Sequence, residues 1–432
     1  MQIPNIIKSN LDYIEQNLKT NITAEELATM SNYSTFHYYR LFSSVMGSSV
    51  SSYILKRRLD HALSEIADGR KAIDVILEYG FNTYAGFYKA FVKMYGCSPK
   101  KYISIYKYHK PKKPEVAIMY SEQDLREVLK NWEIDKDLRI GNTYIVDETR
   151  VSGSVWMIGN YYILKTGSRD KLLKSMRIAK ALSKQDFTSS VPVLTKMGAE
   201  YLDDKEIFVL THALNGSPLS KADRFGNNRT YFGKKYGESI ARLHIALLEV
   251  QNEFLPDEVD LFKDVLEWAL PYVRQQNTQW NIGFPDEFFI DYIDTFGKLF
   301  DKLPKQLIHR DPNPGNILFE NNKVTGFIDF DLSEFNIRLW DVCYCATGIL
   351  SENNEEEYDK WLDILLGILR GYDSKNKLTD EEKQAVFYVI CSIQMICIAY
   401  FENREEFRQL ARTNRIMLLY IMNSRSKIMN IF

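Results

Sequence analysis

The stretch 307–335, which reads LIHRDPNPGNILFENNKVTGFIDFDLSEF, contains the most specific spacing of chemical groups in the chain. Two β-forming runs, Gln306–His309 and Ile317–Glu320, flank a segment interrupted by two prolines and a glycine, which cannot continue regular structure. A third β-forming run, Val324–Phe330, follows an Asn-Asn turn at 321–322. The sequence therefore predicts strand, tight loop, strand, turn and strand.

Two carboxylates and one amide are expected to meet at the ends of these strands. Asp311 and Asn316 lie in the tight loop, and Asp329 is in the last part of the third run. Phosphoryl transfer needs such a set, because one carboxylate accepts the proton of the attacking hydroxyl while an amide and a second carboxylate hold Mg²⁺. A single aspartate at a strand end is as often a loop or cap residue, so only the joint pattern favours this chemistry.

The motif His309–Asp311 with Asn316, followed by Ile328–Asp331, resembles the catalytic and metal-binding loops of the kinase fold. The Pro-Gly before Asn316 and the later Trp340-Asp341 pair resemble the aminoglycoside phosphotransferase branch, whose members phosphorylate small molecules. The resemblance implies a small-molecule ligand or phosphate acceptor, and ATP or another nucleoside triphosphate with Mg²⁺ as cofactors. It also implies catalytic roles for Asp311 and Asn316, metal ligation by Asn316 and Asp329, and a supporting role for Asp341.

Length and composition bound the rest of the interpretation. A chain of 432 residues with 45% hydrophobic and 13% aromatic residues is long enough for two to three globular domains. No apolar run reaches the ~18 residues of a membrane helix and no leader segment opens the chain, so we expect a cytoplasmic protein without a membrane partner. Five cysteines fit no metal-binding pattern, and reduced, mostly buried thiols are expected.

The first quarter of the chain is basic. Residues 1–110 contain 14 Lys/Arg and 9 Asp/Glu, a net charge of +5, which leaves −7 for the remainder. Thr23 precedes a short helix with capping-box spacing, and a second helix from Thr35 to Met46 would turn Tyr38 and Phe42 inward. This helix-turn-helix pattern suits a polyanionic partner such as double-stranded DNA, although plain helical bundles share it.

An internal repeat strengthens the DNA interpretation. Shifted by 49 residues, Tyr39–Phe42 overlays Tyr88–Phe91, and the amphipathic run Val50–Asp68 reads as one helix connecting the two copies. Two recognition helices held in this way can enter successive major grooves about 34 Å apart. Residues 6–104 resemble the AraC-type DNA-binding domain, which implies double-stranded DNA as a partner and RNA polymerase as a candidate partner.

The candidate DNA contacts lie away from the apolar faces of the two recognition helices. They are Thr35, His37 and Arg40 in the first copy, and Tyr84, Ala85, Tyr88 and Lys89 in the second. For Arg40, a contact with guanine is as well supported as a contact with phosphate or a surface position without a DNA contact. Tyr84-Ala85-Gly86 replaces the serine-rich helix start that is commoner in the family, so the second copy either reads bases poorly or grips phosphate.

A basic, proline-containing stretch, 105–120, is interpreted as the linker to a β-rich amino lobe at 121–216. Lys165 ends the third expected strand of this lobe, where a kinase fold places the lysine that pairs with the α- and β-phosphates. Other candidate nucleotide contacts are the turn residues Ser152 and Gly153, for which an ordinary hairpin is the better explanation when the turn is taken alone, and Thr211 and Ala213 in the expected hinge. The helix expected at 170–184 lacks the glutamate that normally holds this lysine.

The predicted fold is thus multidomain: an all-α tandem helix-turn-helix domain at 1–104, followed by an α+β two-lobed kinase-like domain whose mostly helical carboxy lobe spans 217–432. The function expected first is a transcription regulator whose kinase-like domain binds Mg-ATP and a small molecule and is a candidate to phosphorylate it. The alternatives are a small-molecule phosphotransferase with an accessory DNA-binding arm, and a catalytically silent ligand sensor. The sequence leaves open the ligand, the DNA target and the oligomeric state.

Overall fold

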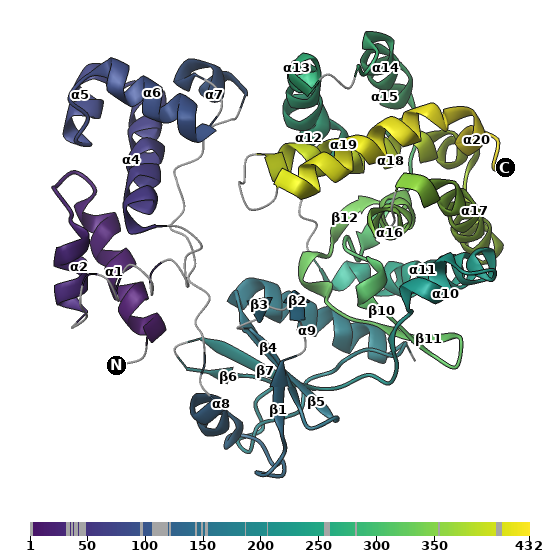
Figure 1. Cartoon of the computed structure of the whole chain (residues 1–432). Helices are drawn as coiled ribbons and strands as arrows, with labels where there is room; N and C mark the ends of the chain where they lie inside the picture. Colours follow the sequence, from purple (N-terminus) through teal and green to yellow (C-terminus); the bar gives the residue numbers. More distant parts are fainter. Residues whose placement is uncertain are drawn as a thin grey trace. The chain divides into compact units, whose positions relative to one another are not determined.

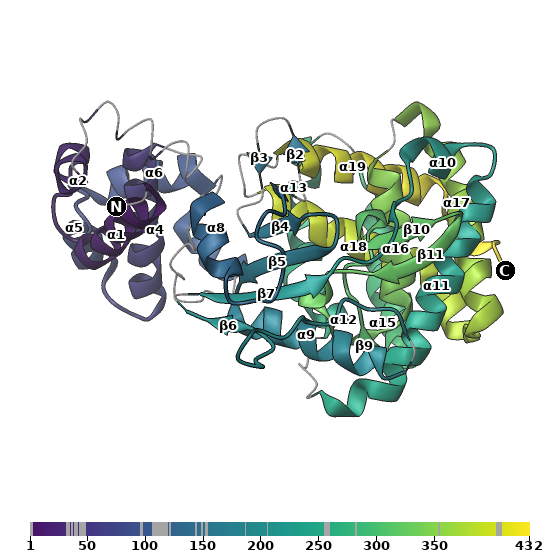
Figure 2. The same cartoon turned by 90° about the horizontal axis from the view of Figure 1, so that it is seen from below.

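The computed structural model of the chain is shown in Figures 1 and 2. It describes residues 3–31, 35, 38, 42, 49–95, 98–105, 120, 122–142, 145–147, 150–151, 154–185, 187–204, 206–254, 260–280, 283–352, 355–402 and 408–432. The contacts divide it into two compact units, Met1–Leu125 and Arg126–Phe432, which are described separately. Most of the stretch interpreted as the linker lies outside the described residues.

The first unit is entirely helical where it is described. Its helices are α1 (Ile3–Asn17), α2 (Ala24–Met30), α4 (Val50–Ala67), α5 (Ala72–Glu78), α6 (Tyr84–Tyr95) and α7 (Pro99–Ile105). Thr23 caps α2 as expected, because its hydroxyl accepts the backbone N–H of Glu26 at 3.1 Å. In the second helix of the first copy only Thr35, Tyr38 and Phe42 are described; all three are helical, and the two aromatic rings are fully buried as predicted.

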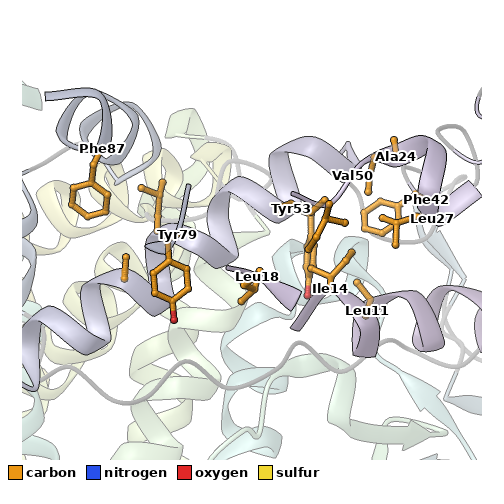
Figure 3. Close-up of a cluster of buried hydrophobic side chains, with 14 of the residues drawn as sticks. Leu11, Ile14, Leu18, Ala24, Leu27, Phe42, Val50, Tyr53, Tyr79 and Phe87 are labelled. Carbon is orange, nitrogen blue, oxygen red and sulfur yellow. The ribbon is translucent and has the colours of Figure 1, made fainter. Parts of the chain in front are cut away.

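A single hydrophobic cluster connects the two copies through α4. Leu11, Leu27 and Phe42 pack at one end of the cluster, and Phe87 of α6 lies at the other (Figure 3). Tyr53 and Leu59 of α4 are buried between these groups. The connecting helix predicted from the repeat is therefore confirmed as the element around which both helix-turn-helix copies are built.

An ion pair joins α1 to this connecting helix. Arg57, only 4% exposed, donates from Nε and Nη2 to the two carboxylate oxygens of Glu15 at 2.6 and 2.7 Å. His61 Nε2 lies 3.2 Å from the same carboxylate. Burial alone would raise the pKa of Glu15, but the hydrogen bonds from Arg57 and His61 lower it to about 2. Arg57 is thus a buried structural residue rather than part of a solvated charged face.

Helix α8 (Glu122–Leu129) spans the boundary between the units, and the described residues of the second unit form four sheets. A five-stranded antiparallel sheet has the order β1 (Ile140–Asn142), β4 (Val155–Ile158), β5 (Tyr162–Gly167), β7 (Ile207–His212) and β6 (Leu202–Asp203). A two-stranded sheet pairs β2 (Ile145–Asp147) with β3 (Arg150–Val151). The other sheets pair β8 (Ser217–Pro218) and β11 (Lys323–Phe327) with β10 (Ile317–Glu320), and β9 (Lys305–Ile308) with β12 (Glu334–Ile337).

Helices form most of the rest of this unit. They are α9 (Arg169–Ser183), α10 (Lys221–Phe225), α11 (Arg229–Val250), α12 (Leu261–Asp264), α13 (Leu270–Trp280), α14 (Asp286–Asp291), α15 (Gly297–Phe300), α16 (Leu339–Ser351), α17 (Tyr358–Lys375), α18 (Asp380–Glu402), α19 (Arg408–Asn423) and α20 (Arg425–Met429). Helices α11 and α17 pack with their backbones in contact, since a Cβ at Gly237 would overlap the carbonyl oxygen of Ile368. Two π-helical segments, Val265–Ala269 and Tyr292–Phe296, interrupt the helices that the sequence predicts as continuous.

Helix α18 is the one described helix that is long and apolar enough to cross a membrane. Inside this unit, however, 72% of its apolar window is buried. It carries Met395 and Cys391, both fully buried, and packs on α16 and α19. We therefore assign α18 to the core of the second unit.

The predicted strand–loop–strand–turn–strand order at 306–330 is confirmed by β9, β10 and β11. The Asn321-Asn322 turn is confirmed by φ values of 50° and 62°, which match the left-handed conformation of a tight hairpin. The sequence did not predict β12, which follows directly and pairs with β9. Because of this strand, β9 and β10 belong to different sheets although a short loop connects them.

The ion pair between Glu15 and Arg57 yields a stability prediction. Glu15→Gln should destabilise the first unit by on the order of 3 kcal/mol at pH 7, because Arg57 is left buried without its counter-charge. Hydrogen exchange of the α1 and α4 amides in the full chain measures the change. The pKa of Glu15 is lower in the folded than in the unfolded state, so its contribution to stability is lost as the pH falls from about 4 towards 2. The difference in stability between wild type and Glu15→Gln should therefore disappear in that range.

Glu78→Gln is the matched control, because Glu78 pairs with Arg70 and Lys19 at the exposed surface. It should change α1 and α4 protection far less than Glu15→Gln does. Equal effects of the two substitutions at pH 7 would contradict the special role of the buried pair.

Candidate functional site

The loop between β9 and β10 brings the predicted acid and amide together. The side-chain Nδ2 of Asn316 donates to the backbone oxygen of Asp311 at 2.9 Å and to its carboxylate at 3.2 Å. Asn313 also donates to the Asp311 carboxylate, at 3.0 Å. A one-turn 3-10 helix, Pro314–Asn316, completes the loop and packs against α16, where a Cβ at Gly348 would lie 3.0 Å from Pro314.

Asp341 in the first turn of α16 anchors this loop. It is fully buried, and its two carboxylate oxygens accept the backbone N–H groups of His309 at 2.8 Å and Arg310 at 2.9 Å. His244 of α11 approaches the same carboxylate at 2.9 Å, and its other ring nitrogen lies 2.9 Å from the Tyr372 hydroxyl. The supporting role expected of Asp341 is confirmed, and His244 is a buried structural residue.

The third predicted residue, Asp329, directly follows β11 and the extended residue Ile328. Its backbone adopts φ 69°, a left-handed conformation that is uncommon for a residue with a side chain. The Ile328 N–H donates to the Asn316 carbonyl at 3.0 Å, which ties the two loops together. The structure therefore brings Asp311, Asn316 and Asp329 to one place, as the sequence predicts.

Lys165 of β5 reaches this site from the five-stranded sheet. Its Nζ lies 3.0 Å from Oδ1 of Asp329, and the two side chains are 25% and 40% exposed. The carboxylate beside this lysine therefore comes from the loop after β11 and not from α9. A nucleotide that binds both groups must compete with this partly exposed pair.

Helix α9 packs against a short 3-10 helix, Phe330–Leu332, which carries Asp331 two residues after Asp329. Burial raises the pKa of Asp331, and Lys165 opposes the shift. Oδ1 of Asp331 is buried and has no hydrogen-bond partner among the residues that the structure describes. Sequence reasoning placed Asp331 outside the set of direct ligands.

The donor set fits a hard divalent cation. Asn316 uses its Nδ2 on Asp311, which leaves the Oδ1 atom as its acceptor, and Asp329 and Asp331 add carboxylate oxygens. Mg²⁺ is typically held by one or two carboxylates together with substrate phosphates. No group of three or more His, Cys, Asp or Glu side chains suitable for a metal occurs in the described ranges.

Tyr344 is a site residue that sequence reasoning missed. Tyr344 lies beside Asp311, and its ring stacks on Trp340 at 5.8 Å between centroids. Burial raises the pKa of Asp311, while Asn313 and Tyr344 lower it less. The available signal was the i, i+4 spacing of the two aromatic residues on α16, which puts them on one helix face.

The structure describes two of the four remaining predicted nucleotide contacts. Ser152 and Gly153 lie outside the described residues. Thr211 is in β7, paired with Ile163, at the end of the sheet where the hinge is expected. The Ala213 N–H donates to the Tyr161 carbonyl at 2.8 Å. In this arrangement the Ala213 carbonyl can accept a hydrogen bond from an adenine, but its N–H is already in use.

The candidate DNA contacts of the second copy form one exposed face of α6. Tyr84 and Tyr88 are 45% and 41% exposed, with their rings 6.4 Å apart, and Ala85 and Lys89 are exposed beside them. In the first copy Thr35 is partly exposed, whereas His37 and Arg40 lie outside the described residues.

Comparison with known families agrees with this geometry. The family model described as a phosphotransferase enzyme family matches residues 144–374, more than half of the chain. The chain belongs to the phosphotransferase enzyme family. A helix-turn-helix domain model matches residues 27–104, so an AraC-type helix-turn-helix domain precedes the phosphotransferase domain. Both parts of the fold predicted from the sequence are thereby confirmed.

Relatives match each part separately. An uncharacterized helix-turn-helix regulator of Bacillus subtilis is 34% identical over 110 residues, 25% of this chain and 37% of its own length. The transcriptional activator AarP of Providencia stuartii is 33% identical over 98 residues, 22% of this chain and 73% of its own. Homoserine kinase of Zymomonas mobilis is 26% identical over 156 residues, 36% of this phosphotransferase-family chain and 47% of its own.

Among solved structures, the GDP complex of aminoglycoside 2'-phosphotransferase-IIIa aligns with a TM-score of 0.51 at 14% identity. The alignment covers 71% of this chain and 100% of that enzyme. It shows the phosphotransferase fold. The chain spans little more than a third of the length of the Bacillus regulator, so the likeness to that protein is confined to the helix-turn-helix domain and its flanks.

The buried Asp341 leads to a second prediction. Asp341→Asn should lower the unfolding free energy of the phosphotransferase domain by on the order of 2 kcal/mol, because an amide cannot accept both backbone N–H groups. Tryptophan fluorescence during urea unfolding reports on this domain, since all six tryptophans follow residue 126. Asp363→Asn, which removes a partner of Arg229 at a surface pair, is the control and should have a much smaller effect. Equal stability of the Asp341 variant and wild type would contradict the anchoring role.

Proposed function

We propose that the protein is a DNA-binding transcription regulator whose phosphotransferase domain binds Mg-ATP, or another nucleoside triphosphate, and phosphorylates a hydroxyl group of a small molecule. The observation that carries the proposal is the convergence of Asp311, Asn316, Asp329 and Lys165 at one site. Aminoglycosides and homoserine, the compounds in the names of the compared kinases, both carry hydroxyl groups. A cytoplasmic location is the natural expectation for such a regulator.

Asp311 is the residue suited to the proton transfer. The acceptor hydroxyl oxygen forms a bond to the γ-phosphorus, the bond from that phosphorus to the β,γ-bridging oxygen breaks, and ADP leaves. The hydroxyl proton goes to the Asp311 carboxylate, which Asn313, Asn316 and Tyr344 hold in position. Bound Mg²⁺ would neutralise phosphate charge, with Asn316 and Asp329 as its protein ligands.

Lys165 supports binding of the phosphates. Lys165 lies within β5, which continues to Gly167 instead of ending at the lysine as the sequence predicts. A lysine here that leaves Asp329 can pair with the phosphate oxygens of a nucleotide, while the released carboxylate becomes available to the metal. Both changes replace one partly exposed ion pair with interactions to a highly charged ligand. The silent-sensor alternative shares this binding step and differs only in that Asp311 accepts no proton.

The helix-turn-helix domain supports the DNA part of the proposal. Its two copies are fixed on α4 by one continuous core, and α6 of the second copy presents Tyr84, Tyr88 and Lys89 outward. An exposed lysine contributes phosphate affinity, whereas tyrosine rings provide apolar surface and hydroxyl groups for base edges or sugars. The helix-turn-helix regulators to which this domain is similar agree with this assignment.

Catalysis is tested by Asp311→Asn. The substitution should lower ATP-dependent phosphorylation of an acceptor about 10²–10⁴-fold and leave Mg-ATP binding nearly unchanged, because an amide cannot take up the hydroxyl proton. Product formation is followed by mass spectrometry, and nucleotide binding by calorimetry. In the wild type, activity should fall with decreasing pH already above the ordinary aspartate range near ~4, because burial raises the pKa of Asp311. Undiminished turnover by the variant would show that Asp311 is not the base.

DNA binding is tested on α6. Lys89→Ala should weaken binding to the chain's own promoter region to the same extent for all DNA sequence variants. It should also reduce the slope of log affinity against log salt concentration by about one, which corresponds to one counterion fewer released. Tyr88→Ala should instead change the preference among base substitutions in the site. Electrophoretic mobility shifts at several salt concentrations measure both effects. Lys298→Ala on α15 is the control. Wild-type binding that does not depend on salt would contradict the assignment.

A further inference from the structure

The residue next to the proposed base, Arg310, has a guanidinium group that the chain uses only in part. Its Nε lies 2.8 Å from a Glu334 carboxylate oxygen. Its Nη1 is buried and has no hydrogen-bond partner among the described residues, although the side chain as a whole is 21% exposed. A buried donor without an acceptor is costly, so this edge of the guanidinium is suited to an acceptor that the chain itself does not provide.

The position of this group relative to Asp311 is fixed by stacking. The Arg310 guanidinium lies 3.5 Å from the centroid of the Trp340 ring, and Trp340 in turn stacks on Tyr344. Tyr344 lies beside Asp311, and the Trp340 indole N–H donates to the Arg310 carbonyl at 2.9 Å. Two stacked aromatic rings therefore connect the surroundings of the cation with those of the proposed base.

Helix α18 lies next to both groups. Arg310 lowers and Asp311 raises the pKa of the Cys397 thiol, after the larger effect of its burial, and the same two residues act in the same directions on Tyr344. Arg310 and Asp311 thus share neighbours on α16 and α18.

We propose that the phosphate acceptor is a small hydroxylated carboxylate, whose anionic group binds the unused edge of Arg310 while its hydroxyl lies at Asp311. The inference rests on the proposed phosphotransferase function and adds the chemical class of the acceptor. A planar guanidinium with free N–H groups matches the geometry of a carboxylate. In this arrangement Arg310 is a specificity residue, and Asp311 performs the proton transfer.

The test compares three short acceptors, each with one primary hydroxyl group, in the full-length protein. L-homoserine carries a carboxylate and an amine, 4-hydroxybutyrate only the carboxylate, and 3-aminopropan-1-ol only the amine. We expect the two carboxylates to be phosphorylated with kcat/KM about tenfold or more above that of 3-aminopropan-1-ol, as fits a charge-assisted hydrogen bond. A preference for 3-aminopropan-1-ol or kanamycin, or no stabilisation of the Mg-ADP-bound protein by either carboxylate in a thermal-shift assay, overturns the proposal.

Substitutions at Arg310 test whether this residue causes the preference for carboxylates. Arg310→Gln should remove the preference for carboxylates mainly by raising KM, and Arg310→Lys should retain part of it because the charge remains. Arg274→Gln, which changes an exposed arginine paired with Asp286, should leave the preference unchanged. A carboxylate preference that survives Arg310→Gln contradicts the role of this residue. Binding of Mg-ATP without acceptor is measured in parallel, so failure of the nucleotide site is distinguished from a wrong acceptor class.

Discussion

The buried carboxylate of Asp341 is the constraint on which the phosphotransferase site depends. It satisfies two successive backbone N–H groups, of His309 and Arg310, at the point where Arg310 adopts a left-handed φ of 75°. Such a conformation costs about 1–3 kcal/mol in a residue with a side chain, and the surrounding contacts must hold it. His244 fixes the carboxylate from α11, so the direction in which Asp311 leaves β9 is set by two helices of the core.

The helix that carries Asp341 also carries the neighbours of the proposed base, Asp311. Trp340 directly precedes Asp341, and its indole holds the Arg310 carbonyl and stacks on the guanidinium. One turn later on α16, Tyr344 reaches Asp311. Three side chains on one face of α16 therefore support the loop backbone, the cation and the base.

Much of this site was predictable, because its residues come from one short stretch of sequence. The prolines and glycine of the loop forced a tight connection, and strand pattern placed Asp311, Asn316 and Asp329 near one another. The partner of Lys165 was not predictable, since Asp329 lies 164 positions away and only tertiary packing selects it over Asp170. Strand β12 was missed because Glu334–Ile337 is short and joins β9 through pairing that no local pattern reveals.

In the helix-turn-helix domain, too, some features were predictable from the sequence and others were not. Its repeat, connecting helix and inward aromatic residues followed from periodicity, and the buried cluster on α4 confirms them. The ion pair of Glu15 with Arg57 did not follow, because only the approach of α1 buries Arg57, the central member of a run of three basic residues. Periodic features are local, whereas buried charge pairs depend on which elements meet.

The central claim is that the loop anchored by Asp341 forms a nucleotide site with Asp329 and Lys165. Calorimetric titration of the full-length protein with ATP, with and without Mg²⁺, tests this claim most directly. The account predicts Mg²⁺-dependent binding by the wild type, and for Asp329→Ala an affinity that no longer responds to Mg²⁺. Binding by Asp329→Ala with unchanged affinity and unchanged Mg²⁺ dependence would contradict it.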